Sequence, residues 1–212
     1  PRLESLPVFT GGLVGYFGYE IVQQFEPRLA DGDKPDEIGT PEMVLLLSEE
    51  VAVFDNLAGR LYLIVNADPS VPQAWSAAQR RLDRLAHRLR CGSQGYGEPL
   101  SRAAVVEEDF HYGFSRPDFI AAVEKCKQYI LSGDIFQVVL SQRFRVPAGD
   151  TDLFDVYRCM RAINPSPYMF FLDFADESYI VGSWPDVLVR LQDGAAAVRC
   201  IAVTRPRGTT TA

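Results

Sequence analysis

The first half of the chain alternates short apolar runs with one long amphipathic stretch. Residues 43–67 read MVLLLSEEVAVFDNLAGRLYLIVNA, and these β-rich runs around a turn at NLAG predict two or three strands. Residues 72–90 are predicted as a helix, because apolar positions recur there at spacings of three and four. The expected buried stripe of this helix is Trp75, Ala78, Leu82, Leu85 and Leu89.

Residues 11–20 read GGLVGYFGYE and place four glycines among aromatic residues. A nucleotide-binding loop needs the GxGxxG pattern followed directly by a helix. Because this stretch lacks that arrangement, we favour close packing between strands over nucleotide binding.

The second half opens with a well-marked helix at residues 115–134. Ser115 is a suitable N-cap, Pro117 lies in the first turn, and Gly133 ends the helix. Cys126 falls on the apolar stripe, so we expect it to pack in the core rather than act as a nucleophile. The stripe consists of Phe119, Ile120, Val123, Cys126 and Ile130.

A strand and a second helix are predicted next. Residues 135–146, IFQVVLSQRFRV, show the alternation of a strand, and residues 152–163 show helical spacing. The apolar face of the strand is expected to hold Phe136, Val138, Leu140 and Phe144. The apolar face of the helix is expected to hold Leu153, Val156, Tyr157 and Met160.

The last part of the chain is predicted as a meander of strands at residues 168–174, 178–183, 187–192 and 195–203. The turn at Asp193–Gly194 suits a type I′ hairpin. Hairpins this tight require antiparallel neighbours. We therefore predict an α+β fold with antiparallel sheets rather than a doubly wound parallel sheet.

One linker divides the predicted elements into two regions. Residues 91–101, CGSQGYGEPLS, are rich in Gly, Ser and Pro and lack periodicity. The expected domains are an N-terminal region at residues 1–100 and the first part of a second domain at residues 101–212.

Composition and charge exclude several classes of protein. The 212 residues carry a net charge of -7, which argues against a nucleic-acid partner. The most basic stretch, residues 80–90, is interpreted as a solvated helix face rather than an anion-binding patch. The four cysteines form no CxxC pair, and only two histidines accompany them, which disfavours a zinc site. We expect reduced thiols, a cytoplasmic location, no signal peptide and no membrane span.

Polar residues near the ends of the predicted strands are the candidates for chemistry. The segment NPSPYMFF has a rigid, proline-flanked edge at which Tyr168 and Met169 could clasp a flat ring, although composition alone favours core packing. Asp186 could act as a general acid if burial raised its pKa, or could be a simple turn residue. Thr204 could donate a hydrogen bond beside two carboxylate-binding arginines, Arg205 and Arg207, or this loop could be solvated.

Five segments in order carry a family resemblance: GGLVGYFGYE, SGDIFQVVLSQRF, NPSPYMFFLDF, VGSWPDVLVRL and IAVTRPRG. They closely resemble component I, the large subunit, of anthranilate synthase, a chorismate-utilising enzyme. The resemblance implies large antiparallel sheets with outer helices. It also implies conversion of chorismate and ammonia or glutamine to anthranilate and pyruvate, with Mg²⁺, in tryptophan synthesis. A glutamine amidotransferase subunit (component II) is the implied partner, and tryptophan is the implied feedback inhibitor.

The resemblance assigns roles to particular residues. Thr204 matches a residue that contacts chorismate, with Val203 beside it, and Asp186 matches a glutamate expected to protonate the departing ring hydroxyl. Ala202 stands where aminodeoxychorismate synthases carry a nucleophilic lysine, which favours the anthranilate branch. The implied tryptophan-binding residues are Asn164, Ser166, Pro167, Tyr168 and Met169.

Three departures bear on activity. The family's glutamate is the shorter Asp186, its proline is Cys200, and its glycine is Val203, whose side chain would crowd an approaching substrate. The family's Mg²⁺ ligands, catalytic histidine and carboxylate-binding arginine lie further on, so no metal ligands are expected in this chain. We therefore expect these 212 residues alone to be inactive.

Two alternatives stay open. The chain could be a non-catalytic fragment that keeps the tryptophan pocket or the amidotransferase-docking face. It could also derive from a related enzyme that makes isochorismate or aminodeoxyisochorismate, in which pyruvate is retained.

Overall fold

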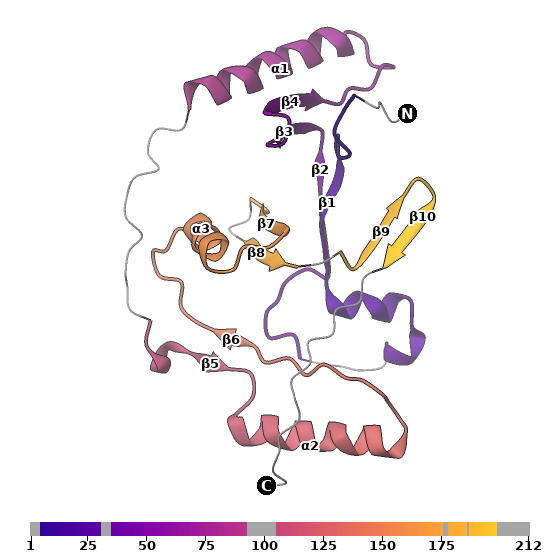
Figure 1. Cartoon of the computed structure of the whole chain (residues 1–212), viewed down its shortest axis with the longest axis vertical. Coiled ribbons are helices and arrows are strands. Elements are labelled where there is room, and N and C mark those ends of the chain that lie inside the picture. The colour runs from indigo at the N-terminus through magenta and orange to yellow at the C-terminus, as the bar shows by residue number, and fades with distance from the viewer. Residues whose placement is uncertain (1–4, 31–34, 93–104, 176–177, 186, 199–212) are drawn as a thin grey trace. The chain divides into compact units, whose positions relative to one another are not determined.

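The computed structural model describes residues 5–30, 35–92, 105–175, 178–185 and 187–198. Two compact units make up the chain: Pro1–Glu98 with Leu172–Tyr179, and Pro99–Phe171 with Ile180–Ala212. Helices and antiparallel strand pairs occur together, so the predicted α+β class is confirmed (Figure 1). Most of the predicted linker, residues 91–101, lies outside the described residues. Within the described part of the chain, no helix has the length and apolar composition needed to cross a bilayer.

The first unit contains two strand pairs and one long helix. β1 pairs with β2 and β3 pairs with β4, both antiparallel. The predicted strands of residues 43–67 and the helix after them are confirmed, and two short 3₁₀ helices follow β1. The elements are β1 (Gly12–Phe17), β2 (Met43–Ser48), β3 (Glu50–Asp55), β4 (Arg60–Val65), α1 (Ala74–Cys91), and the 3₁₀ helices Tyr19–Gln24 and Pro27–Leu29.

Close approach of β1 and β2 explains one of the clustered glycines. Gly15 lies opposite Leu45 in the ladder, and a Cβ added to it would come within 1.9 Å of the carbonyl oxygen of Val44. Any side chain here would force the strands apart. The interpretation of GGLVGYFGYE as close strand packing is confirmed for this position.

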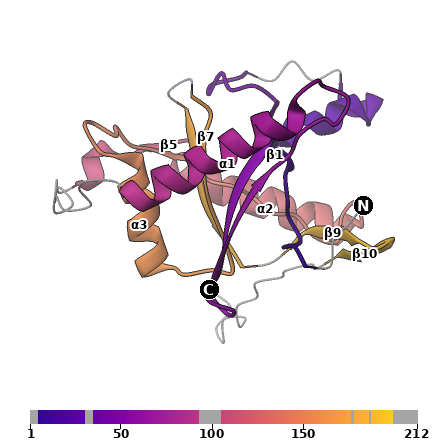
Figure 2. The same cartoon turned by 90° about the horizontal axis from the view of Figure 1, so that it is seen from above.

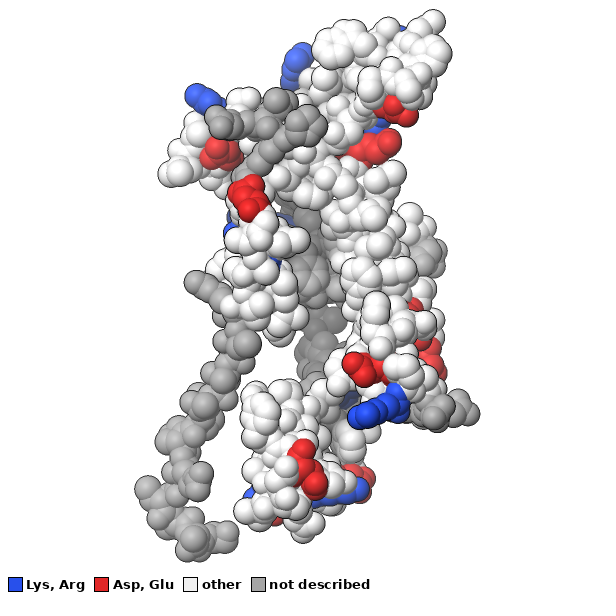
Figure 3. Space-filling view, turned by 90° about the vertical axis from the view of Figure 1, so that its right-hand side faces the viewer, with Lys and Arg blue, Asp and Glu red and all other residues white. Residues whose placement is uncertain are grey.

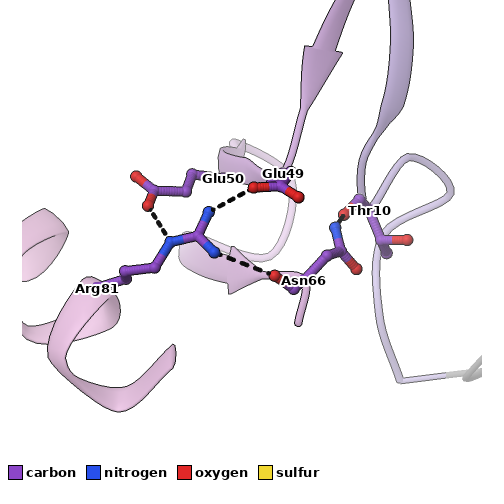
Figure 4. Close-up of polar contacts among 5 residues, drawn as sticks. All are labelled: Thr10, Glu49, Glu50, Asn66 and Arg81. Carbon is purple, nitrogen blue, oxygen red and sulfur yellow. Dashed lines mark hydrogen bonds and ion pairs between the residues drawn. The ribbon is translucent and has the colours of Figure 1, made fainter. Parts of the chain in front are cut away.

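Figure 2 shows α1 lying across the strands of the first unit. Arg81 attaches α1 to residues at the ends of β3 and β4 (Figure 4). Its Nε donates to Glu50 at 2.5 Å, and its two terminal nitrogens donate to Glu49 at 3.2 Å and to the carbonyl of Asn66 at 3.3 Å. The Asn66 side chain in turn donates to the carbonyl of Thr10 at 2.7 Å. The hydrogen bond with Glu50, followed by the charges of both glutamates, raises the pKa of Arg81 although dehydration opposes the shift.

Only part of the predicted stripe on α1 is covered. Ala78, at 8% exposure, is the one buried residue among those described. Trp75 is 77% exposed, so the prediction that it is buried is wrong. It stands in the first turn of α1, where it borders a shallow hollow beside Pro69 and Val71 instead of packing under the helix.

The second half of the chain contains three further strand pairs and two helices. β5 pairs with β6, β7 with β8, and β9 with β10. These sheets are smaller than the resemblance implied. The elements are β5 (His111–Tyr112), α2 (Arg116–Ser132), β6 (Phe144–Arg145), α3 (Leu153–Ile163), β7 (Tyr168–Asp173), β8 (Tyr179–Trp184), β9 (Val189–Gln192), β10 (Ala195–Val198), and a 3₁₀ helix at Glu107–Asp109.

Both ends of α2 are as predicted. The Ser115 hydroxyl accepts a hydrogen bond from the backbone N–H of Asp118 at 3.3 Å, which caps the first turn. Gly133 has φ of +83°, and its N–H donates to the carbonyl of Ile130 at 3.2 Å. The stripe is not buried, however, because no described residue of α2 is fully covered.

The strand predicted at residues 135–146 is wrong in its extent. Only Phe144 and Arg145 are in a ladder, opposite Tyr112 and His111. The backbone contact extends one residue further, because the N–H of Gly113 donates to the carbonyl of Arg143 at 2.9 Å. A strand needs a neighbour for its backbone hydrogen bonds, and among the described strands none forms a ladder with residues 135–142.

The predicted meander is two separate hairpins. β7 pairs with β8 and β9 with β10, but no described ladder joins the two pairs, so the expectation of one sheet is wrong. Asp193 and Gly194 have φ of 52° and 79°, which confirms a type I′ turn. The end of the last predicted strand, residues 199–203, lies outside the described residues.

Candidate functional site

The connection between α3 and β7 carries the residues that the resemblance assigned to tryptophan binding. Asn164 caps the end of α3, where its N–H donates to the carbonyl of Met160 at 2.8 Å. Tyr168 is the first residue of β7, and Met169 follows it. The segment therefore turns the chain from a helix into a strand within four residues, 164–167.

Two serine hydroxyls tie this connection to the end of β8. Ser183 donates to the carbonyl of Asn164 at 2.8 Å, and Ser166 donates to the carbonyl of Trp184. The Ser166 hydroxyl also accepts from the N–H of Tyr168 at 3.4 Å. The two prolines of NPSP have no N–H to offer, so side-chain hydroxyls supply the bonds between the two segments.

Aromatic packing supports the same strand. The ring of Phe171 on β7 lies 5.2 Å from that of Phe154 on α3, at an interplanar angle of 88°. Gly182 on β8 makes room for the next ring, because a Cβ there would lie 2.1 Å from Cζ of Phe170. The connection is thus held by packing on β7 and by hydrogen bonds to β8.

Tyr168 borders a small hollow of about 230 Å³. Arg190 of β9 and Ala197 of β10 stand opposite each other in their ladder and also line it, with Val187 and Val198. Arg190 makes no hydrogen bond or ion pair with any described residue. A phenol ring and an uncommitted guanidinium around one hollow suit a small molecule that has a flat apolar part and a carboxylate.

Met169 is not among the residues that line this hollow. Successive side chains of a strand point to opposite faces, so Tyr168 and Met169 face different ways. Sequence reasoning missed Arg190 and Ser183. The polar residues of VGSW and VLVR were the available signal, but nothing in the sequence placed them beside NPSPYM.

The remaining candidate residues, Asp186, Val203 and Thr204, lie outside the described residues. The same holds for Ala202 and Cys200, and for Arg205 and Arg207. The sequence places Asp186 two positions after Trp184, the residue whose carbonyl Ser166 binds.

No metal centre is formed by the part of the chain that the structure describes, since no three His, Cys, Asp or Glu side chains there could share an ion. On α1, Sγ of Cys91 lies 3.5 Å from Nε2 of His87, but two ligands by themselves do not make a metal site. The described residues therefore do not fit the Mg²⁺ that the resemblance implies.

A family model for chorismate binding enzymes matches residues 2–212. The chain belongs to this family. Among curated proteins, anthranilate synthase component 1 of Pseudomonas aeruginosa is 47% identical over 209 residues, which are 98% of this chain and 42% of that protein. The Neisseria meningitidis protein of the same name is 47% identical over 215 residues, covering 100% of this chain and 43% of its own length.

A solved structure agrees with these sequence matches. Anthranilate synthase component I of Streptococcus pneumoniae superposes with a TM-score of 0.79 at 33% identity, over 92% of this chain and 43% of that chain. The resemblance inferred from the five motifs is thereby confirmed. The chain spans less than half the length of the relatives that it matches.

Proposed function

We propose that this chain is part of an anthranilate synthase component I. In this role it would convert chorismate and ammonia, or glutamine through an amidotransferase subunit, to anthranilate and pyruvate in tryptophan biosynthesis. One observation carries the proposal: the match to anthranilate synthase component 1 proteins extends over 98% of the chain at 47% identity. The rest of the active site, including any Mg²⁺ ligands, is assigned to residues outside this chain, and the reaction is assigned to the cytoplasm.

Three residues are assigned to chorismate. Asp186 would protonate the ring hydroxyl as it leaves, Thr204 would donate a hydrogen bond to the substrate, and Val203 would border it. Ala202 carries no amine, so ammonia itself would add to the ring. The hydrogen bond from Ser166 to the carbonyl of Trp184 ties the NPSPYM connection to β8, the strand that precedes Asp186 in the sequence.

Tryptophan is assigned to the α3–β7 connection. The hollow beside Tyr168 and the uncommitted Arg190 support an amino-acid effector there. The other assigned residues are Asn164, Ser166, Pro167 and Met169. Inhibition requires that tryptophan bind an inactive arrangement more tightly than the active one.

A hybrid enzyme tests the catalytic proposal. Residues 1–212 would replace the matching segment of the Pseudomonas aeruginosa protein, and anthranilate fluorescence would be followed with chorismate, Mg²⁺ and ammonium. We expect turnover in the hybrid and none from the 212 residues alone. Val203→Gly, which restores the family's glycine, should raise kcat/KM by about ten- to a hundredfold, because small displacements at a reacting centre cost that much.

Val105→Gly in the hybrid is the matched control, because Val105 is 55% exposed and lies outside the residues assigned to chorismate or tryptophan. An inactive hybrid that is correctly folded would refute the proposal. Release of isochorismate or an amino-dihydro product, with pyruvate retained, would instead identify the related chorismate enzymes as the correct class.

A further inference from the structure

Another hollow lies between the start of α2 and the β5–β6 ladder. Its volume is about 650 Å³, within the range of roughly 300–1,000 Å³ that small-molecule sites occupy. Tyr112 of β5 and Phe144 of β6 line it, with Phe114, Phe119 and Ile120. No residue of the α3–β7 connection takes part, so this hollow is separate from the site proposed for tryptophan.

Aromatic rings form the walls of this hollow. Tyr112 and Phe144 stand opposite each other in the ladder, with ring centres 5.3 Å apart and an interplanar angle of 76°. Phe114 and Phe119 meet edge to face at 6.1 Å. All of these side chains keep part of their surface exposed, so an aromatic ring that entered the hollow would meet other rings.

Most polar groups around the hollow are already engaged. The side chain of Gln142 accepts from the N–H of Phe114 at 3.0 Å and donates to its carbonyl at 2.8 Å. The Ser115 hydroxyl is bonded to Asp118. The side chains of Gln142 and Ser115 therefore hold the lining in place and offer few further donors or acceptors to a ligand.

The first turn of α2 has few backbone N–H groups left for an anion. Pro117 has no N–H, Asp118 donates its N–H to Ser115 Oγ, and Phe119 donates its N–H to the Ser115 carbonyl at 3.0 Å, so the N–H of Arg116 is the remaining donor of this turn. Side chains therefore supply most of the groups that could recognise a ligand.

Two charged side chains of opposite sign remain available on the lining. Arg116 makes no hydrogen bond or ion pair with any described residue. Glu107 uses Oε1 to accept from the Tyr112 hydroxyl, while Oε2 has no partner in the described part of the chain. Among the described residues, the guanidinium of Arg116 and Oε2 of Glu107 thus have no partner, and both lie beside the aromatic rings of the hollow.

We propose that this hollow binds a free aromatic amino acid in its zwitterionic form. Arg116 binds the α-carboxylate, Oε2 of Glu107 accepts from the α-ammonium group, and the ligand ring packs among Tyr112, Phe119 and Phe144. A ligand with only one charge would leave one of the two side chains without a counter-charge. This charge complementarity favours a zwitterion over a simple aromatic acid or amine.

Calorimetry on the full 212-residue chain tests the proposal with three probes of one shape: L-phenylalanine, 3-phenylpropionate and 2-phenylethylamine. The second lacks the ammonium group and the third lacks the carboxylate. We expect L-phenylalanine to bind about tenfold more tightly than either analogue, since each analogue loses one charge-assisted contact.

Two substitutions separate the contacts. Arg116→Gln should weaken L-phenylalanine and 3-phenylpropionate about tenfold and leave 2-phenylethylamine unchanged. Glu107→Gln should weaken L-phenylalanine and 2-phenylethylamine and leave 3-phenylpropionate unchanged. Lys125→Gln, which removes a cation from α2 outside the hollow, is the matched control and should change none of the three affinities.

Circular dichroism of each variant shows whether the secondary structure still forms, so a folding defect cannot be mistaken for a lost contact. Equal binding of all three probes, or equal losses for all three in both variants, would overturn the proposal. Absence of binding at millimolar concentration would also overturn it, and would favour a polypeptide segment as the natural cover of the hollow.

Discussion

At the scale of single residues, the contact between Tyr112 and Glu107 depends on pH. The hydrogen bond to Glu107, followed by loss of hydration and by the negative charge of Glu107, raises the pKa of Tyr112 above its ordinary value of about 10. The protonated phenol is therefore favoured in the folded chain. Its contribution to stability is fully present below pH ~10 and is lost as pH rises through the raised pKa.

An alkaline titration followed by tyrosinate absorbance checks this prediction. The difference between the wild-type chain and Tyr112→Phe isolates the transition of Tyr112 from those of the other eight tyrosines. We expect this transition above pH ~10 in the wild-type chain, and closer to that value in Glu107→Gln, which keeps an acceptor but removes the charge. The same transition pH in both backgrounds would contradict the assignment.

At the scale of elements, one side chain makes the described polar contacts between α1 and the residues at the ends of β3 and β4. Arg81 is the residue of α1 that reaches both Glu49 and Glu50 and the carbonyl of Asn66 (Figure 4). Arg84 lies one turn further on, is exposed, and has no partner among the described residues. The two arginines form a matched pair for a test of docking.

Arg81→Gln should lower the melting temperature of the first unit by about 2–4 °C, because three contacts between α1 and the strands are lost. Arg84→Gln should leave it unchanged. Thermal unfolding followed by far-ultraviolet circular dichroism, which reports the loss of α1, provides the measurement. Equal effects of the two substitutions would mean that general charge, rather than docking, decides the stability.

At the scale of the whole molecule, the chain exposes many large apolar side chains. Phe136 is 93% exposed and Val139 is 82% exposed, both in the segment that lacks a strand partner. Figure 3 shows wide uncharged areas between scattered acidic and basic residues. Exposed apolar surface of this kind favours association.

We therefore expect the 212-residue chain to self-associate in solution, with a molar mass that rises with concentration in light scattering. Replacing Phe136 and Val139 by Gln should lower the degree of association. The paired substitution of Lys125 and Lys127 by Gln, which changes charge but not apolar area, should not lower it. A monomer at all concentrations would contradict the prediction.

The sequence alone was enough to predict caps and turns, because a few adjacent residues decide these features. The cap at Ser115, the glycine at the end of α2 and the turn at Asp193–Gly194 all depend on backbone conformations that a few adjacent residues impose. The helices and the strands of residues 43–67 followed from spacing alone. The sequence also contained the motifs by which the family was recognised.

Contacts between distant segments could not be predicted in this way. Residues 135–142 have the alternation of a strand, but no described strand pairs with them. Trp75 has the spacing of a buried position but is 77% exposed. Tyr168 and Arg190 line one hollow, and Glu107 and Arg116 line another. Both pairings depend on which elements pack together.

The helices, most strands, the turns and the family could be predicted from the order of residues, because propensity, capping and motif order are properties of short stretches. Strand pairing, the exposure of apolar faces and the sharing of a hollow by charged side chains became known only from the folded chain. Hydrogen-bonded ladders and burial require two partners, and a one-dimensional pattern specifies only one of them.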